Sequence, residues 1–391
     1  MERLWNSNYL KVWLANFMIF FSFMLLAPLL PIYLSGEPFS ADNDTIGIVL
    51  AGYTLTALLI RPFSGYFVDS FPRKMVLLIS YFLFFALFAG YLVASSLTLF
   101  TIVRFRHGAP MGAVSVANST VAIDVLHPTR RAEGIGYYGL SNNLATAISP
   151  TIGLWLYHVT QDFSLLFIIA LVCSGIGFFI NCTVHVKQRE IVKNKEPLSL
   201  DRMFLRVGWR AGVTMAFLSS SYGVISTYLA KYAAENTDSE IDTGIFFAIL
   251  SVGLIISRLT GAKGLREGRV LQNVSHGILI SVVGYFLFAL IPNWIGCYLC
   301  ALIVGLGNGH MFPGMQTMFI NLAENNQRGT ANSSQLTTWD IGMGIGMLFG
   351  GIISRHTGYH EAFWFAWGMN VAGVLFFFAY VHNHYLRHKL R

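Results

Sequence analysis

Residues 337–351 read TTWDIGMGIGMLFGG, an apolar, glycine-rich run that contains a single carboxylate, Asp340. The run is the centre of a longer stretch, residues 329–354, that has no other charged residue. About 20 consecutive apolar residues in a helix cross a hydrocarbon core of roughly 30 Å. The stretch therefore predicts a transmembrane helix, and the acid inside it needs an explanation.

The whole chain shares this apolar character. Of its 391 residues, 54% are hydrophobic and 12% are charged, whereas about 25% are charged in a typical soluble domain. We expect an all-α polytopic membrane protein with twelve transmembrane helices. The predicted spans are residues 10–34, 45–68, 75–95, 97–121, 132–157, 164–186, 209–231, 243–262, 270–291, 294–320, 329–354 and 361–383.

The distribution of basic residues predicts the orientation of these spans. If both termini are cytoplasmic, most of the 26 lysines and arginines fall in inner loops and tails, while the outer loops are rich in acids such as Glu37. Short cytoplasmic loops carry such a positive excess. We therefore expect a multi-pass protein of the cell (inner) membrane with both termini in the cytoplasm. The basic pI reflects this topology, and no nucleic-acid partner is expected.

The two halves of the chain are copies of one repeat. A polar connection, residues 187–208, separates residues 1–186 from 209–391, and we expect six helices in each part. A constant offset of 197 residues aligns Gly47 with Gly244, Arg61 with Arg258, Gly108 with Gly305, Gly112 with Gly309, Asp124 with Asn321, Arg131 with Arg328 and Gly153 with Gly350. Repeats with an even number of spans insert the same way up, which predicts two pseudo-symmetric six-helix bundles.

Asp340 needs a partner, because a carboxylate at a helix centre costs about 2.5–3.5 kcal/mol on insertion scales. At 1.5 Å per residue, Asp340 lies roughly 17 Å above the inner end of its span and Arg104 roughly 12 Å below the outer end of its own. We expect Asp340 to take up a proton and to release it when Arg104 or a cationic substrate approaches. The alternative is a permanent Asp–Arg pair that locks the halves together.

Other polar and aromatic residues lie inside the predicted spans. We place Asn142, Asn143 and His107 near the level of Asp340 and Arg104, and add as candidates Asn16, His310, Tyr222 and Trp339. The two histidines are either proton relays or buried residues with satisfied hydrogen bonds. The aromatic residues form either a wall for an amphipathic substrate or ordinary packing. Arg106 points away from Arg104, and its role is left open.

Glycines recur at helical spacing in the last part of the chain. Gly342, Gly346 and Gly350 form a small-xxx-small pattern, which permits close helix packing. The counterpart in the first half includes Gly153, with Pro150 nearby. The pattern predicts a helix contact, either static or one that moves during a functional cycle.

The segment RPFSGYFVDSFPRK, residues 61–74, resembles the loop motif of the major facilitator superfamily through Gly65, Asp69, Arg73 and Lys74. The resemblance implies two six-helix bundles that rock about a central site. It also implies that Asp69 meets the inner end of span 329–354 and that Arg73 pairs with Asp124, with Arg131 in the same cytoplasmic gate. The alternative is a solvated turn that only fixes topology. The second copy, residues 257–269, lacks the acid.

Two further segments resemble motifs of exporters that exchange substrates for protons. RFRHG at 104–108 resembles the motif Arg-x-x-Gln-Gly, with His107 in place of glutamine, and GLSNNLATAISPTIG at 139–153 resembles the antiporter motif, with Ala145 and Ser149 in place of glycines. These resemblances imply a drug or metabolite exporter.

We therefore expect a secondary transporter that exports a small organic molecule in exchange for protons. The alternatives are an uptake symporter of a nutrient and a membrane enzyme or assembly factor. The sequence has no HExxH pair, GxSxG elbow or Walker-type loop. We expect no cofactor and no metal, and a monomer in the lipid bilayer with a small-molecule substrate and protons as partners.

Overall fold

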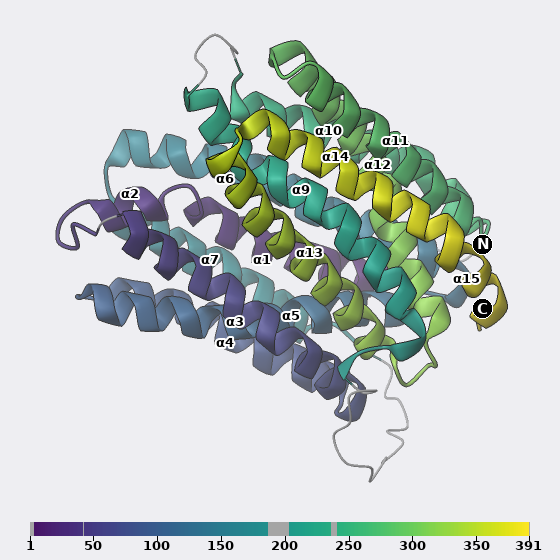
Figure 1. Cartoon of the computed structure of the whole chain (residues 1–391). Coiled ribbons are helices and arrows are strands. Elements are labelled where there is room, and N and C mark those ends of the chain that lie inside the picture. Colours follow the sequence, from purple (N-terminus) through teal and green to yellow (C-terminus); the bar gives the residue numbers. More distant parts are fainter. Residues whose placement is uncertain (1–3, 42, 187–202, 236–240, 391) are drawn as a thin grey trace. The chain divides into compact units, whose positions relative to one another are not determined.

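The computed structural model describes residues 4–41, 43–186, 203–235 and 241–390. Most of the predicted linker, residues 187–202, lies outside the described residues. Within the described ranges the chain forms helices and no strand, and twelve of the helices have 18 residues or more (Figure 1). The predicted all-α class is confirmed.

The helices follow the predicted spans closely. In the first half they are α1 (Ser7–Leu26), α2 (Leu30–Ser35), α3 (Asn43–Ser70), α4 (Arg73–Val93), α5 (Leu97–Asp124), α6 (Arg131–Thr160) and α7 (Phe163–Cys182). In the second half they are α9 (Trp209–Glu235), α10 (Thr243–Arg266), α11 (Val270–Leu290), α12 (Trp294–Leu322), α13 (Arg328–His356), α14 (Tyr359–Phe376) and α15 (His382–His388). A π-helical turn, Phe377–Val381, joins the last two, and 3₁₀ turns occupy Pro128–Arg130 and Arg206–Gly208.

The first predicted span differs in one detail, because the structure divides it between α1 and α2. Pro28 follows the end of α1 and has no backbone N–H to continue the hydrogen-bond ladder. Leu29 donates to the carbonyl of Leu26 at 2.9 Å instead, and α2 begins at Leu30. The break thus coincides with a missing donor, although Pro110 and Pro150 lie inside continuous helices.

Nine segments of the described chain are long and apolar enough to cross a membrane by length and composition. The three remaining long helices are α5, α6 and α9. They carry polar residues in their middles, among them Arg104, Asn142 and Ser220. Five of the nine candidate residues lie on these three helices, namely Arg104, His107, Asn142, Asn143 and Tyr222.

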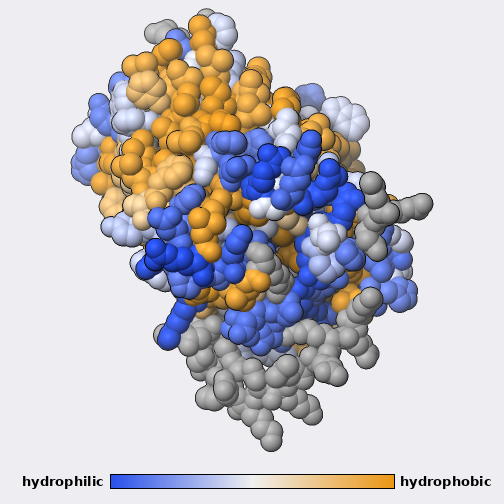
Figure 2. Space-filling model, turned by 90° about the vertical axis from the view of Figure 1, so that its right-hand side faces the viewer, coloured by the Kyte–Doolittle hydropathy of each residue, from blue (hydrophilic) through white to orange (hydrophobic). Residues whose placement is uncertain are grey.

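Large apolar side chains cover the outward faces of the helices. Phe179 and Leu375 are each 65% exposed, and Leu259 is 63% exposed. Such exposure is unfavourable in water but not in hydrocarbon. On the face displayed in Figure 2, hydrophobic residues cover the upper part and hydrophilic residues gather below them. The exposed apolar side chains fit helices that have lipid on their flanks.

By their contacts the residues form two compact units. The first comprises residues 1–130, 141–203 and 328–333, and the second comprises residues 131–140, 204–327 and 334–391. Two helices, α6 and α13, thus contribute residues to both units. We describe each unit by itself.

In the first unit α5 packs along α3 and α4, and α7 packs along α1 and α4 (Figure 1). Glycines bring α5 and α3 together. A Cβ on Gly108 would lie 2.0 Å from the carbonyl oxygen of Tyr53, and one on Gly112 would lie 2.4 Å from that of Ala57. No side chain larger than hydrogen fits at such distances.

The second unit repeats this packing with α12 against α10. A Cβ on Gly305 would lie 2.3 Å from the carbonyl oxygen of Leu250, and one on Gly309 would lie 1.6 Å from the hydroxyl oxygen of Ser257. Gly305 and Gly309 are the repeat partners of Gly108 and Gly112. The sequence repeat therefore preserves a specific helix contact.

Candidate functional site

Asp69, near the end of α3, binds the first turn of α13 within the first unit. Its Oδ1 accepts a hydrogen bond from the backbone N–H of Gly329 at 2.9 Å, and its Oδ2 accepts from the N–H and the hydroxyl of Thr330 at 2.8 and 2.9 Å. These N–H groups have no partner inside the helix, and Gln327 provides no side-chain cap. Asp69 therefore caps α13 from elsewhere in the chain, where the helix dipole favours an anion.

Two arginines extend this contact. Arg73 lies 3.2 Å from Asp69 and also pairs with Asp124 at the end of α5. Arg328, the first residue of α13, lies 3.0 Å from the second oxygen of Asp124. The four side chains are between 7% and 14% exposed. We call Asp69, Arg73, Asp124, Arg328 and the first turn of α13 the Asp69–Asp124 cluster.

Two glycines allow α3 and α13 to approach closely beside this cluster. A Cβ on Gly65 would lie 2.2 Å from the hydroxyl oxygen of Ser333, and one on Gly329 would lie 2.8 Å from the carbonyl oxygen of Gly65. Lys74 donates to the carbonyl of Cys182 at 2.9 Å, away from the acids. Arg131 is the first residue of α6 and belongs to the second unit.

The second unit has no equivalent acids at these positions. Arg266 occupies the place of Asp69 in the repeat and is exposed, and Asn321 occupies the place of Asp124 and donates to the hydroxyl of Tyr385 at 2.8 Å. His310, on α12 of the same unit, has Nδ1 3.0 Å from Oδ1 of Asn273 and Nε2 3.3 Å from the hydroxyl of Thr260. Both ring nitrogens of His310 thus have partners. This is the arrangement expected of a buried histidine with satisfied hydrogen bonds, the alternative to a proton relay.

Arg104 lies in the first unit among aromatic rings. Its guanidinium carbon is 4.2 Å from the ring centre of Tyr53 and 5.5 Å from that of Phe23, and Nη1 lies 3.4 Å from the hydroxyl of Tyr91. The residue is 5% exposed. Within the described chain it takes part in no ion pair. Its charge is stabilised here by ring faces, at about 0.5–2 kcal/mol for such a contact.

His107 lies one turn further along α5 and is fully buried. Its Nδ1 is 3.0 Å from the hydroxyl of Tyr91, the same hydroxyl that Arg104 contacts. Ring centres of Phe88 and Phe84 lie 4.6 and 4.8 Å from the imidazole. The sequence analysis did not identify Tyr91, because a tyrosine in an apolar span gives no sign of which polar group it faces.

A chain of amides links α6, α1, α5 and α7. Asn16 donates to the hydroxyl of Ser141 at 2.7 Å and also to Oδ1 of Asn142. Asn118 donates to Asn16 at 3.4 Å, and Asn181 donates to Asn118 at 3.0 Å. Buried amides of this kind are costly unless paired. Asn118 and Asn181 were not among the predicted residues, although each is an amide inside a predicted span.

Asn143 lies next to this chain but does not extend it. Its Nδ2 is buried and has no hydrogen-bond partner among the described residues. Its side chain therefore keeps a buried hydrogen-bond donor available.

Asp340 lies in the second unit, half-buried on α13. The adjacent Trp339 has its ring 5.9 Å from that of Tyr222 and 5.3 Å from that of Phe312. These rings form an aromatic group next to the acid. Asp340 and Arg104 belong to different units, so their approach stays a prediction.

The predicted glycine pattern packs α13 against α9 in the second unit. A Cβ on Gly342 would lie 2.3 Å from the carbonyl oxygen of Ala216, and one on Gly346 would lie 2.0 Å from that of Ser220. At Gly350 the contact is less close but still tight, because such a Cβ would lie 3.1 Å from side-chain atoms of both Tyr228 and Val224.

In the first unit Gly153 packs α6 against α1. A Cβ there would lie 2.3 Å from the carbonyl oxygen of Leu25. Pro150 lies one turn earlier inside α6. Both halves therefore use glycine in the corresponding helix pair, but the closest backbone contacts fall at different positions of the repeat, because Ala145 and Ser149 stand where the second half has Gly342 and Gly346.

Comparisons with known proteins agree with this architecture. The sequence model of the Major Facilitator Superfamily matches residues 12–275 and 274–390. The chain is 22% identical over 385 residues to the quinolone resistance protein NorA of Staphylococcus aureus strain MRSA252, covering 95% of each chain. It is 23% identical over 385 residues to the staphylopine export protein of Staphylococcus aureus strain Mu50, covering 94% of this chain and 93% of that protein.

Solved structures show the same fold at low sequence identity. The human organic anion transporter MFSD10 superposes with a TM-score of 0.80 at 16% identity, over 95% of this chain and 98% of the other. The transporter FucP in its outward conformation superposes with a TM-score of 0.76 at 16% identity, over the same shares.

Proposed function

Since this chain belongs to the major facilitator superfamily and is a multi-pass membrane transporter with that fold, we propose that it exports a small organic molecule in exchange for protons. The family and the sequence relatives are transporters rather than enzymes. Two relatives are named for quinolone resistance and for staphylopine export, and both names support transport of the substrate out of the cell. In this proposal the protein works as a monomer in the cell (inner) membrane, with both termini in the cytoplasm.

The observation that carries the proposal is the Asp69–Asp124 cluster. It joins residues that are as many as 261 positions apart, and it does so through ion pairs and hydrogen bonds. Such contacts break and re-form without repacking a hydrophobic core, which is what a reversible gate requires. In this proposal the cluster holds the cytoplasmic side closed while the opposite side is open.

The coupling residues are Asp340 and Arg104. A partly buried carboxylate inside a membrane span is a functional group by default. Arg104 has ring faces but no anion beside it in the described chain, so it remains able to bind one. In this proposal Asp340 carries the proton and Arg104 binds an acidic group, either Asp340 or one on the substrate.

The direction of exchange is testable with imposed pH gradients. Purified protein in proteoliposomes is given a fluorescent quinolone outside, and either the interior or the exterior is made acidic. Proton exchange predicts that the quinolone accumulates only when the interior is acidic, because protons leave as it enters. Accumulation only with an acidic exterior would instead show symport, and counterflow without any response to pH would show an uncoupled carrier.

A further inference from the structure

The hydroxyl of Tyr91, on α4, connects two residues of α5. It lies 3.4 Å from Nη1 of Arg104 and 3.0 Å from Nδ1 of His107. Tyr91 is 2% exposed, and His107 is fully buried. The rings of Phe100 on α5 and Phe167 on α7 pack against that of Tyr91, with ring centres 5.1 and 5.5 Å away. The hydroxyl is therefore fixed between a cation and an imidazole, away from water.

The guanidinium group of Arg104 decides the direction of these hydrogen bonds. Arginine has N–H donors and no acceptor, so the oxygen of Tyr91 accepts from Arg104. A tyrosine hydroxyl carries one hydrogen, and His107 offers the only acceptor for it among the described residues. The hydrogen therefore goes to Nδ1 of His107, and this nitrogen must hold a lone pair.

Other protonation states of His107 leave more polar groups without a partner. Nε2 is buried and has no hydrogen-bond partner in the described part of the chain. With the hydrogen on Nδ1 instead of Nε2, the hydroxyl hydrogen of Tyr91 and the lone pair of Nε2 both lack a partner. With hydrogens on both nitrogens, a second positive charge is also buried beside Arg104. The neutral ring with its hydrogen on Nε2 leaves only that N–H unpaired, and buried unpaired groups are costly.

The surroundings of the imidazole give it no counter-charge. The groups with a charge or a titratable hydrogen that face it are Arg104 from α5, Tyr91 from α4 and Tyr53 from α3, whose ring centre is 5.6 Å from that of the imidazole. Its other ring neighbours are phenylalanines. Across the described ranges no carboxylate pairs with His107. A charged imidazole would thus face a cation and no anion.

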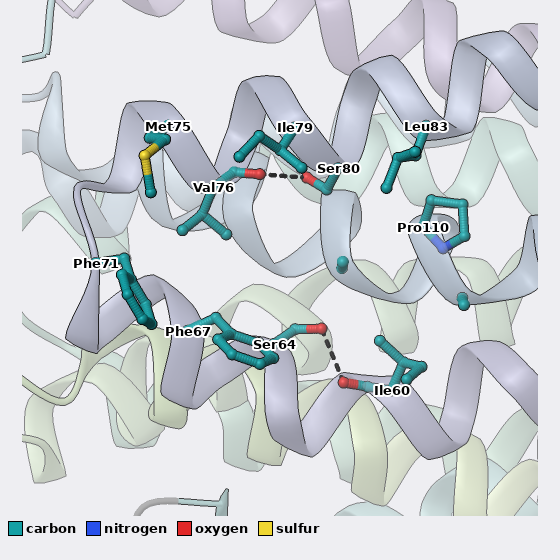
Figure 3. Close-up of a pocket in the computed structure, with 12 residues that line it drawn as sticks. Ile60, Ser64, Phe67, Phe71, Met75, Val76, Ile79, Ser80, Leu83 and Pro110 are labelled. Atoms are coloured by element: carbon teal, nitrogen blue, oxygen red, sulfur yellow. Dashed lines mark hydrogen bonds between the residues drawn. The ribbon is translucent and has the colours of Figure 1, made fainter.

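An apolar cavity of about 410 Å³ lies among α3, α4 and α5 and is separate from this group (Figure 3). Neither Arg104 nor His107 lines it, although it reaches Pro110 on the same helix. The two hydroxyls in its wall, on Ser64 and Ser80, donate to carbonyls of their own helices. The cavity therefore supplies no hydrogen-bond partner to His107.

We propose that Tyr91 and His107 are positioning residues for Arg104, and that His107 acts as a neutral hydrogen-bond acceptor rather than as a proton carrier. The inference rests on the proposed function, in which Arg104 binds an acidic group. By accepting the hydroxyl hydrogen, His107 keeps the oxygen lone pairs of Tyr91 turned toward Arg104. Without that acceptor the hydroxyl hydrogen rotates to suit other neighbours. The held guanidinium keeps its remaining N–H groups for the acidic group.

Glutamine can take the place of His107 in this role. Its side-chain oxygen accepts a hydrogen bond, and its amide does not titrate. Glutamine also stands at this position in the exporter motif that residues 104–108 resemble. Leucine, in contrast, has no acceptor. These two substitutions at position 107 therefore separate hydrogen-bond acceptance from the exchange of a proton.

Nitrogen NMR tests the state of His107 without a transport assay. Full-length protein with ¹⁵N-labelled histidine is reconstituted in lipid bilayers, and the His107 signals are identified as those lost in His107→Gln. We expect an N–H at Nε2 and a lone pair at Nδ1 both at about pH 5 and at about pH 8, the range in which histidine ordinarily titrates. N–H signals from both nitrogens at the lower pH, or a lone pair on Nε2, would overturn the proposal.

The same method with labelled arginine tests the effect on Arg104. We expect the Arg104 signals to move in Tyr91→Phe and in His107→Leu and to return toward their wild-type positions in His107→Gln. The matched control is Tyr81→Phe, which removes another buried hydroxyl of α4, one that donates to the carbonyl of Ala15 at 2.9 Å. Equal movement in Tyr81→Phe, or none in Tyr91→Phe, would show a structural role only. Tyr91→Phe decides the matter if His107→Leu does not fold.

Transport kinetics connect these spectra to the proposed function. For the fluorescent quinolone in proteoliposomes, Tyr91→Phe and His107→Leu should lower kcat/KM at least fivefold, and His107→Gln should recover most of the loss. Accumulation in His107→Gln should still respond to the imposed pH gradient, and loss of that response would identify His107 as a proton carrier and overturn the proposal. If the wild-type protein does not transport the quinolone in either direction, the proposed function fails, and the two NMR experiments still decide the state of His107 and its effect on Arg104.

Discussion

Asp69 and Thr330 are 261 positions apart, yet Oδ2 of Asp69 accepts two hydrogen bonds from Thr330, one from its N–H and one from its hydroxyl. The same carboxylate accepts the N–H of Gly329 and contacts Arg73. One acid thus caps a helix and holds an arginine that is shared with Asp124. A single substitution at Asp69 should therefore affect several contacts at once.

Asp69→Asn should slow transport without weakening substrate binding. The amide removes the charge that interacts with the helix dipole and with Arg73, a loss of about 1–2 kcal/mol. We expect at least a tenfold lower kcat, with KM within twofold of wild type, in vesicle transport assays. Glu267→Gln, in an exposed pair with Arg269, is the control and should behave as wild type. A raised KM with normal kcat would assign Asp69 to the substrate site instead.

Asp124 and Arg328 should show coupled effects on stability. Asp124→Ala leaves two buried arginines without their shared anion and should cost about 3–5 kcal/mol. Arg328→Ala leaves Asp124 paired with Arg73 and should cost about 1.5–3 kcal/mol. The double variant should cost less than the sum by at least about 0.5 kcal/mol, measured by thermal unfolding in detergent. Additive costs would mean that the two residues do not interact in the folded protein.

Two glycines of α13 should respond in opposite ways to the same substitution. Gly346→Ala places a methyl group 2.0 Å from the carbonyl oxygen of Ser220, so α9 and α13 must separate, and we expect a loss of about 1–3 kcal/mol. Gly344 has nothing within 4 Å of such a methyl group. Gly344→Ala should therefore be neutral or stabilising by about 0.5–1 kcal/mol. Equal melting temperatures for the two variants would disprove the close contact.

Tyr91→Phe should lower the stability of the folded protein, and Tyr53→Phe should not. The hydroxyl of Tyr91 contacts both His107 and Arg104, so its removal leaves a buried imidazole without that partner, at about 1–3 kcal/mol. The hydroxyl of Tyr53 is buried without a partner among the described residues, while its ring lies over Arg104. Thermal unfolding of the two variants checks this. Similar losses in both would show that ring packing, rather than the hydroxyl, matters here.

Asp340→Asn should abolish proton-driven accumulation while the protein still folds. The amide keeps the shape of the carboxyl group but does not bind and release a proton. We expect normal counterflow of unlabelled against labelled substrate and at least a tenfold loss of accumulation driven by a pH gradient. Wild-type accumulation in this variant would defeat the assignment of Asp340.

The positions of the helices were largely predictable because membrane insertion depends on the summed hydrophobicity of neighbouring residues. Apolar residues over about 20 positions decide where a span lies, and α10, α12 and α13 begin within one residue of their predicted starts. The break after Leu26 was missed because one proline interrupts the ladder without changing the hydropathy of the run. The resemblance in residues 61–74 also led us to expect Asp69 near span 329–354.

The sequence showed which polar residues lie inside the spans better than it showed which side chains of other helices they contact. Asn16, Asn142 and Arg104 could be selected as polar groups in apolar spans, but Asn118, Asn181 and Tyr91 were missed. Helical periodicity shows which residues share a face of one helix, and it does not show which other helix meets that face.

The sequence by itself determined that the chain spans a membrane and which charges lie inside the spans, because these properties depend on residues close together in the chain. It also determined that the halves repeat, because a repeat is found by aligning one stretch of sequence with another. The tertiary structure decided that Asp69 caps α13 by accepting from Gly329 and Thr330, that Tyr91 joins Arg104 to His107, and that α5 leaves a cavity beside Pro110. These features depend on how side chains from distant helices fill the space between them, and packing of that kind is not encoded in any single stretch of sequence.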